Sequence, residues 1–274
     1  MSYKEYVEDY TLAELMCVAA ARELRDGETI FLGLGLPLLV GTLAKLLHTP
    51  QAQLFTEVGV FDWVPDLEVI NRAPIHIADL PLFVGAAMLG DMADHLGLML
   101  MGGHQDVAFL GAAQVDRFGN LNTMCLGDYH RPTRRLPGVG GNTDGACLSR
   151  RTITIIPQER RRFVEGVDFR TSPGYIDGPG GRTRAGLRPQ GPNVVISTMG
   201  VFRFDTPDGG GSGSCEMYLD AVFPNVSPST IKELTSWDLR VAAELKEVEP
   251  PNVEEVLLLR QLDSLGMFLA EGRY

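Results

Sequence analysis

The stretch that indicates the fold is Leu54-Phe55-Thr56-Glu57-Val58-Gly59-Val60-Phe61, in which a single carboxylate interrupts an apolar run. The run is bordered by Thr49-Pro50 upstream and by Asp62 and Pro65 downstream. Its length and borders are typical of a buried strand and the turn that follows it, and we expect the strand to end at Glu57. Because ligands bind at the carboxyl ends of strands in open α/β sheets, Glu57 is a candidate for chemistry.

A carboxylate at this position is unusual, because removing a charge from water is costly unless a partner compensates. Gly59 allows the backbone to turn sharply or a ligand to approach closely. Glu57 is therefore placed to act as a base, an acid or a nucleophile. The alternative is a glutamate at a strand end that points into solvent, and this stretch alone leaves both interpretations open.

Strand and helix signals alternate along the first half of the chain. Thr11 and Glu14 have the spacing of a capping box, which predicts a helix that continues to Asp26-Gly27. Further strands are expected over residues 29–34, 75–77 and 107–112, and helices over residues 37–47 and 91–100. This alternation predicts an open α/β/α fold with a mostly parallel central sheet that is covered on both faces.

Glycine- and proline-rich loops separate the elements of the second half. Strands are expected over residues 152–156, 193–198 and 218–223, and helices after Ser227 and over residues 252–262. Residues 208–214 are rich in glycine and serine but lack the Gly-Lys-Ser/Thr ending of a phosphate-binding loop, which favours a flexible surface loop. No repeat or domain boundary is evident, so we expect a single domain over residues 1–274.

Composition and charge exclude several classes of protein. With 24 Lys and Arg against 35 Asp and Glu, the net charge is −11, which argues against nucleic acid or an anionic membrane as a partner. Charged residues interrupt the N-terminus before any apolar stretch, and no apolar run is long enough for a membrane span. The four cysteines form no C-x-x-C pair and the five histidines do not cluster with acids, so no metal site is predicted. We expect a reduced, cytoplasmic protein.

Two polar segments carry further candidate residues. Residues 111–122 form a strand that runs into a polar turn, with Gln114 and Asn120 as candidates, although such amides often satisfy only their own backbone. Residues 127–142 combine Asp128, His130, three arginines and the glycines of 138–141. Successive glycines can direct several N–H groups toward one oxyanion or phosphate, while the alternative is an exposed loop with solvated charges.

Taken together, these segments resemble the β subunits of family I CoA-transferases, of the glutaconate CoA-transferase type. The resemblance extends from about Thr11 to Phe268. It is strongest at Gly-Asp-Tyr-His-x-Pro (127–132), at Gly-x-Gly-Gly (138–141) and over residues 172–182. The catalytic glutamate of the family falls on Glu57. Many members read Ser-Glu-Asn-Gly or Glu-Ser-Gly at this place, whereas this chain reads Thr56-Glu57-Val58-Gly59.

The resemblance implies that CoA moves between an acyl-CoA and a carboxylic acid through an acyl anhydride and a CoA thioester on Glu57. CoA is then a cosubstrate, and no permanently bound cofactor or metal is expected. The residues implied for oxyanion stabilisation or CoA binding are Gly138, Val139, Gly140, Gly141 and Asn142. The candidates implied to lie near the substrate are Gln114, Asn120, Asp128 and His130.

The family commonly works with an α subunit, so the resemblance also implies a hetero-oligomer such as α2β2. Other chemistry occurs on the same scaffold, and a decarboxylase and a steroid ring-opening hydrolase resemble this family without a glutamate at this position. The alternatives are thus an acyl-CoA hydrolase, a decarboxylase, or a non-catalytic partner that only binds CoA. A phosphosugar isomerase of related fold is a more distant option.

Overall fold

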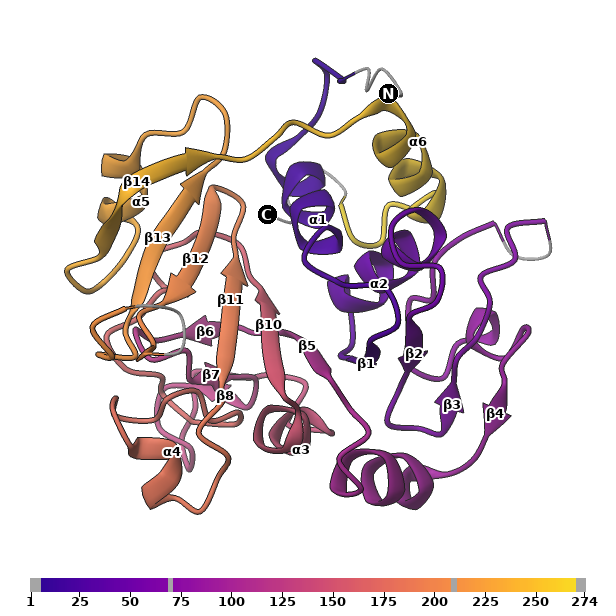
Figure 1. Cartoon of the computed structure of the whole chain (residues 1–274), viewed down its shortest axis with the longest axis horizontal. Helices are drawn as coiled ribbons and strands as arrows, with labels where there is room; N and C mark the ends of the chain where they lie inside the picture. The colour runs from indigo at the N-terminus through magenta and orange to yellow at the C-terminus, as the bar shows by residue number, and fades with distance from the viewer. Residues whose placement is uncertain (1–5, 69–70, 208–210, 270–274) are drawn as a thin grey trace. The chain divides into compact units, whose positions relative to one another are not determined.

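The computed structural model of the chain describes residues 6–68, 71–207 and 211–269. The chain divides into two compact units (Figure 1). Unit 1 comprises Met1–Gly111 and Glu249–Tyr274, and unit 2 comprises Ala112–Val248. The expectation of a single domain over residues 1–274 stays a prediction.

The described strands of unit 1 pair in the order β5-β1-β2-β3-β4. They are β1 (Thr29–Leu32), β2 (Gln53–Phe55), β3 (Val60–Phe61), β4 (Met88–Leu89) and β5 (Val107–Gly111). Strand β1 is buried throughout and pairs in parallel with both β2 and β5. Strands β3 and β4 extend the sheet with antiparallel pairings. The turn that contains Glu57 therefore joins a parallel strand to an antiparallel one.

Three helices of unit 1 pack against one another, namely α1 (Leu12–Ala21), α2 (Leu36–Leu47) and α6 (Val253–Leu262) (Figure 1). The predicted capping box of α1 is present, with Thr11 and Glu14 satisfying each other's backbone N–H groups. The unit also contains the short 3₁₀-helix η1 (Leu80–Leu82) and the π-helix η2 (Ala93–Met101). Contacts between α1, α2 and α6 thus join segments from the first and the last part of the chain in one apolar core.

A buried carboxylate joins α6 to the first two helices. Glu255 accepts hydrogen bonds from Arg22 at 2.9 and 2.6 Å, and His48 Nε2 lies 3.1 Å from its Oε1. Burial alone would raise the pKa of Glu255, but the close His48 ring and the hydrogen bonds from Arg22 outweigh it and lower this pKa to about 2. The ionised form of Glu255 thus stabilises the helical layer of unit 1.

The variant Glu255→Gln is expected to lower the free energy of unfolding by about 2–4 kcal/mol at neutral pH, because a buried charge pair loses one partner. The folded pKa is depressed, so the contribution is complete above the unfolded pKa of about 4.3 and is lost as the pH falls toward 2. Urea unfolding from pH 7 to pH 3 measures this. The exposed neighbour Glu254→Gln is the control, with a change within about 0.5 kcal/mol. A constant gap between Glu255→Gln and wild type down to pH 3 would contradict the assignment.

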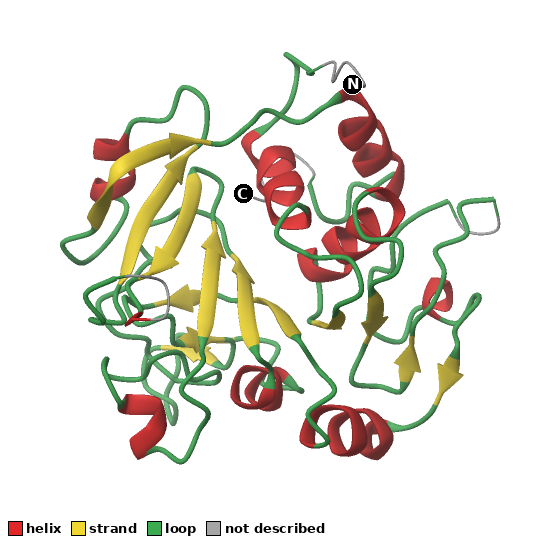
Figure 2. Cartoon of the chain, viewed as in Figure 1, coloured by secondary structure: helices red, strands yellow, loops and turns green. Residues whose placement is uncertain are grey.

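The described strands of unit 2 pair in the order β14-β13-β12-β11-β10. They are β10 (Arg151–Ile155), β11 (Pro192–Ile196), β12 (Gly200–Phe204), β13 (Met217–Val222) and β14 (Arg240–Glu247). The pairings β10–β11 and β13–β14 are parallel, and the two between them are antiparallel. Long irregular segments connect these strands (Figure 2). The segment that precedes β10 carries the hairpins β6–β7 (Gln114–Val115, Leu121–Asn122) and β8–β9 (Cys125–Leu126, Arg134–Arg135) and the helix α3 (Asn142–Leu148). Helix α4 (Gly181–Arg184) lies between β10 and β11, and helix α5 (Pro228–Glu233) lies between β13 and β14.

The predicted α/β fold is confirmed, and in unit 1 the central strands pair in parallel as expected. The strand expected over residues 75–77 is wrong. Side chains bond the local backbone instead, since Ile75 N donates to Asp79 Oδ2, and Ala78 N, directly after the segment, donates to His76 Nδ1. Strands β12 and β14 were not expected from the sequence. No helix among the described residues combines the length and the apolar character that crossing a membrane requires.

Candidate active site

Glu57 lies in the turn that joins β2 to β3 and is half-buried. The strand was expected to end at Glu57 but ends at Phe55, because the backbone of Thr56 already closes the turn. Thr56 N donates to Val60 O at 3.1 Å, and Thr56 O accepts from Gly59 N at 3.3 Å. The carboxylate thus stands at the tip of a hairpin, beyond the carboxyl end of a parallel strand.

Gly59 explains how the turn fits against its neighbour. Its φ is +107°, and a Cβ at this position would lie 2.1 Å from the carbonyl oxygen of Gly90. Gly90 N also donates to Gly59 O at 2.7 Å. The sequence left open whether Gly59 serves a sharp turn or the approach of a ligand. In the structure it serves a turn that protein backbone approaches closely.

A buried lysine holds the strand that leaves the turn. Lys45 of α2 is 8% exposed, donates to Ala52 O at 2.8 Å and forms an ion pair with Asp62. Asp62 has a φ of +49°, and its N–H donates to Leu54 O at 2.6 Å. The two arms of the hairpin are therefore fixed to each other and to α2.

Gly59→Ala tests the close backbone approach. Both φ strain and collision with Gly90 oppose a side chain, so we expect a loss of about 3–5 kcal/mol in the free energy of unfolding. Gly27→Ala is the matched control, because its φ is +78° but a Cβ there meets no atom within 4 Å. The control should lose only about 1–2 kcal/mol. Equal losses in chemical unfolding of the two variants would show that the contact with Gly90 is not tight.

In unit 2, Gln114 belongs to a buried polar network. Its Oε1 accepts from Asn122 Nδ2 at 2.7 Å and from Asp168 N at 3.0 Å, and its Nε2 donates to Asp168 Oδ2 at 3.0 Å. Asp168 Oδ2 also accepts from Gly127 N at 2.9 Å. The network thereby ties Gln114 to the segment that carries Asp128. That Gln114 lies beside substrate stays a prediction.

Asn120 belongs to a second network of the same unit and is fully buried. Its Nδ2 donates to Asp116 Oδ2 and to Ile176 O, both at 2.8 Å, and its Oδ1 accepts from Gly174 N at 2.9 Å. Burial raises the pKa of Asp116, although hydrogen bonds from Asn120 and Phe118 partly offset this. Asn120 therefore joins the 116–120 turn to the 172–182 segment, and its proximity to substrate stays a prediction.

Asp128 and His130 lie in an exposed turn. Asp128 Oδ1 accepts from the backbone N–H groups of His130 at 2.8 Å and Arg131 at 3.1 Å, so the carboxylate shapes its own loop. Tyr129 between them stacks on Phe169 at 5.1 Å and lies under the Arg135 guanidinium at 4.8 Å. This stacking holds the turn in place and leaves His130 at the surface.

The glycine segment 138–141 precedes helix α3 directly. Gly138 and Gly140 have φ values of +109° and +50°, and Gly138 N donates to Thr123 O at 3.0 Å. Asn142 N donates to Val139 O at 3.1 Å. Within the described part of the chain, no backbone acceptor takes the N–H groups of Val139 and Gly140. Whether these groups serve an oxyanion stays a prediction.

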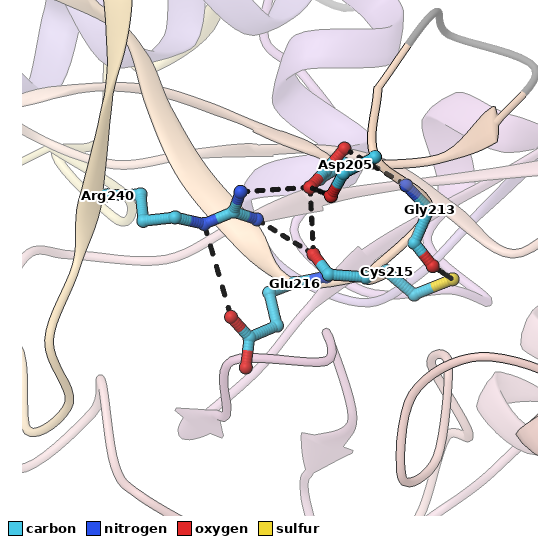
Figure 3. A network of polar contacts seen from close by, with 7 residues as sticks. Asp205, Gly213, Cys215, Glu216 and Arg240 are labelled. Atoms are coloured by element: carbon cyan, nitrogen blue, oxygen red, sulfur yellow. Dashed lines mark hydrogen bonds and ion pairs between the residues drawn. The ribbon is translucent and has the colours of Figure 1, made fainter.

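Part of the glycine- and serine-rich loop is anchored by one buried carboxylate (Figure 3). Asp205 Oδ2 accepts from Ser212 at 2.5 Å, from Ser214 at 2.9 Å and from Arg240 Nη1 at 2.9 Å. Burial opposes the charge, but these hydrogen bonds hold the pKa of Asp205 far below its usual range. The flexible loop expected over residues 208–214 is thus fixed from Ser212 onward, and residues 208–210 lie outside the described residues.

Asp205→Ala should lower the free energy of unfolding by about 2–3 kcal/mol and should expose the loop to limited proteolysis, because several charge-assisted hydrogen bonds are lost. Asp177→Ala is the control. Asp177 pairs with Arg184 at 2.6 Å, but both side chains are more than half exposed, so the change should stay within about 1 kcal/mol. Equal effects of the two substitutions would contradict an anchoring role for Asp205.

Sequence reasoning singled out Glu57 as a candidate but missed the residues that hold its turn and the polar networks of unit 2. Lys45, Gly90 and Asp168 stand far from their partners in the chain, and none lies in a recognisable motif. Lys45 carried one usable signal, as a lysine on an otherwise apolar helix. Across the described residues, no group of three or more potential ligand side chains gathers in the way that a metal ion needs.

Comparison with known proteins shows the family of this chain. A family model described as Coenzyme A transferase matches residues 13–234. This chain belongs to the coenzyme A transferase family. It is a CoA-transferase, as the sequence predicted, and CoA is its cosubstrate.

The chain is similar in sequence and structure to three known proteins. The chain is 36% identical to one subunit of the 3-oxoadipate CoA-transferase of Pseudomonas knackmussii, over 93% of this chain and 94% of the relative. It is 34% identical to one subunit of the glutaconate CoA-transferase of Acidaminococcus fermentans, over 92% of each chain. The crystal structure of that enzyme superposes with a TM-score of 0.85, at 33% identity, over 97% of this chain and 99% of the other. The decarboxylase AibA/AibB superposes with a TM-score of 0.75, at 27% identity, over 94% and 97%.

Proposed function

We propose that this chain is the catalytic subunit of a CoA-transferase that moves CoA between an acyl-CoA and a carboxylic acid, with Glu57 as the nucleophile. The observation that carries the proposal is the position of Glu57, a half-buried carboxylate at the tip of a braced hairpin in a CoA-transferase. A carboxylate is a weak nucleophile in water, so its rate depends on positioning and on removal of water. A braced turn supplies positioning.

In the proposed reaction, a Glu57 oxygen attacks the thioester carbonyl, the carbon–sulfur bond breaks and CoA leaves as its thiolate. The mixed anhydride on Glu57 is then attacked by the thiolate at the glutamyl carbonyl, which releases the donor carboxylate and leaves CoA as a thioester on Glu57. The acceptor carboxylate reverses both steps and leaves as its CoA ester. Atoms, charges and electrons balance without a redox cofactor.

Each addition step creates an oxyanion that needs hydrogen-bond donors. Our candidates are the N–H groups of Val139, Gly140 and Gly141, with Gly138 and Asn142 as the residues that shape the segment. Loss of one such donor typically costs about 10²–10³ in rate. For Gln114, Asn120, Asp128 and His130, the proposed contribution is to shape the surface on which substrate lies.

We further propose that the chain works with an α subunit, in an α2β2 or similar assembly, and in the cytoplasm. The support is that two relatives are each one subunit of a CoA-transferase and that the decarboxylase is a two-component AibA/AibB protein. The first substrates to test are the CoA esters of glutaconate and 3-oxoadipate, which the two relatives' names contain. An isolated chain should then be inactive.

Covalent trapping tests the mechanism. The complex with the α subunit is incubated with each acyl-CoA and quenched with hydroxylamine, which converts a glutamyl thioester or anhydride into a hydroxamate. Peptide mass spectrometry should find the hydroxamate on Glu57. Glu57→Asp keeps the carboxylate but withdraws it by one methylene, so kcat should fall by about 10² or more. Glu57→Ala should abolish both labelling and transfer.

The alternatives give different results in this experiment. A hydrolase or decarboxylase would consume an acyl-CoA without CoA appearing on the acceptor acid. If the chain is a non-catalytic partner that only binds CoA, the complex would keep its activity when it carries Glu57→Ala. Turnover by the wild-type complex with no label on the Glu57 peptide would contradict the covalent mechanism.

A further inference from the structure

A buried histidine contacts the backbone next to Glu57. His95 lies in the π-helix η2 and is 0% exposed, and its Nδ1 is 3.1 Å from the carbonyl oxygen of Thr56. A carbonyl can only accept, so Nδ1 carries the hydrogen and donates. The contact joins two segments of unit 1 that lie 39 residues apart in the chain.

This hydrogen bond acts on the peptide that leads into Glu57. The peptide group is planar, so the plane that contains the Thr56 carbonyl also contains the Glu57 N–H. Gly59 N donates to the same carbonyl at 3.3 Å and closes the turn from within. The two donors together fix the plane from which the Glu57 side chain projects.

Packing alone does not explain a histidine at this position. The ring meets Phe55 and Phe61 edge-on, with centroid distances of 5.9 and 6.2 Å. Nε2 is buried as well, and the described residues offer it no hydrogen-bond partner. An orphaned polar atom among aromatic rings is costly, and a phenylalanine would fill the same space without that cost. The hydrogen bond from Nδ1 is what a histidine adds.

The helix that carries His95 is held in register with the turn. Asp91 Oδ1 accepts from the N–H groups of Ala93 at 2.7 Å and Asp94 at 3.0 Å, and Asp94 Oδ2 accepts from Asp91 N at 3.0 Å. Directly before this cap, Gly90 N donates to Gly59 O. One end of η2 is thus fixed on the Glu57 turn, which places the His95 ring over Thr56.

We propose that His95 is a positioning residue for transfer, which acts by holding the Thr56–Glu57 peptide so that the carboxylate meets the thioester at the required angle. The inference rests on Glu57 as the nucleophile. It assigns to His95 no contact with substrate and no proton transfer.

Three substitutions in the complex with the α subunit separate the hydrogen bond from the ring. His95→Asn places an amide N–H near the position of Nδ1, His95→Gln places it one methylene farther, and His95→Phe keeps the ring without a donor. We expect His95→Phe and His95→Gln to lower kcat and the rate of Glu57 hydroxamate formation by about 10², because a misplacement of about 1 Å costs that much. KM for the acyl-CoA should stay within about threefold, since ground-state binding is unchanged. His95→Asn should recover at least tenfold of the loss, and the melting temperature of His95→Phe should not fall below that of wild type.

Labelling of Glu57 in His95→Phe as fast as in wild type would overturn the proposal. So would equal rates for His95→Asn and His95→Gln, and this comparison decides the matter if His95→Phe does not assemble. A fall in kcat that is matched by a fall in melting temperature across all three variants would show a structural role only. Absence of label on Glu57 in the wild-type complex is a separate result, since it rejects the covalent mechanism itself.

Discussion

The backbone contact between Gly59 and Gly90 is the constraint on which the candidate active site depends. It requires a residue without a side chain at position 59, because a Cβ there would collide with the Gly90 carbonyl. It also sets the distance between the hairpin turn and the start of η2, so it decides whether the His95 ring can reach Thr56. On the other side of the hairpin, Lys45 holds Asp62. These contacts clamp the turn that carries Glu57 through its backbone and through the neighbouring Asp62.

Unit 2 differs from unit 1 in its long connections, which carry many polar groups into the interior. Buried amides and carboxylates there are satisfied almost entirely by backbone and by one another, as in the pairs Gln114–Asp168 and Asn120–Asp116. A half-satisfied network of this kind would cost more than an apolar core. The networks give irregular segments a fixed path, which is what a loop that presents N–H groups to an anion requires. Unit 1 positions its candidate nucleophile in the same way, by hydrogen bonds to backbone.

Much of the fold could be predicted from local patterns, since apolar strands such as β1, β5 and β11 have strong propensity and helices such as α1 and α6 begin at clear caps. The misses have physical causes. Strand β14 is an edge strand with no buried residue, and half of its side chains are charged, so its existence depends on pairing with β13 rather than on an apolar pattern. Strand β12 does carry apolar residues, but its short Gly-Val-Phe-Arg-Phe run offers few positions for a pattern. For the site, the sequence singled out Glu57 as a charge within an apolar run. Lys45 and His95 contact Asp62 and Thr56 of the same hairpin only through tertiary packing, which no local pattern indicates.

The residue that follows Glu57 shows which part of the turn tolerates substitution. Val58 stands where many members of the family carry Asn or Ser, and neither Glu57 nor Val58 has a positive φ. The turn therefore needs no small or amide side chain at position 58, and only Gly59 is required by backbone geometry. A valine in place of serine or asparagine puts an apolar side chain next to Glu57 in the sequence, without a hydroxyl or amide donor. If Glu57 acts as proposed, the side chain of Val58 donates no hydrogen bond to the oxyanion, and the orientation of the carboxylate depends on the turn and on the groups that clamp it.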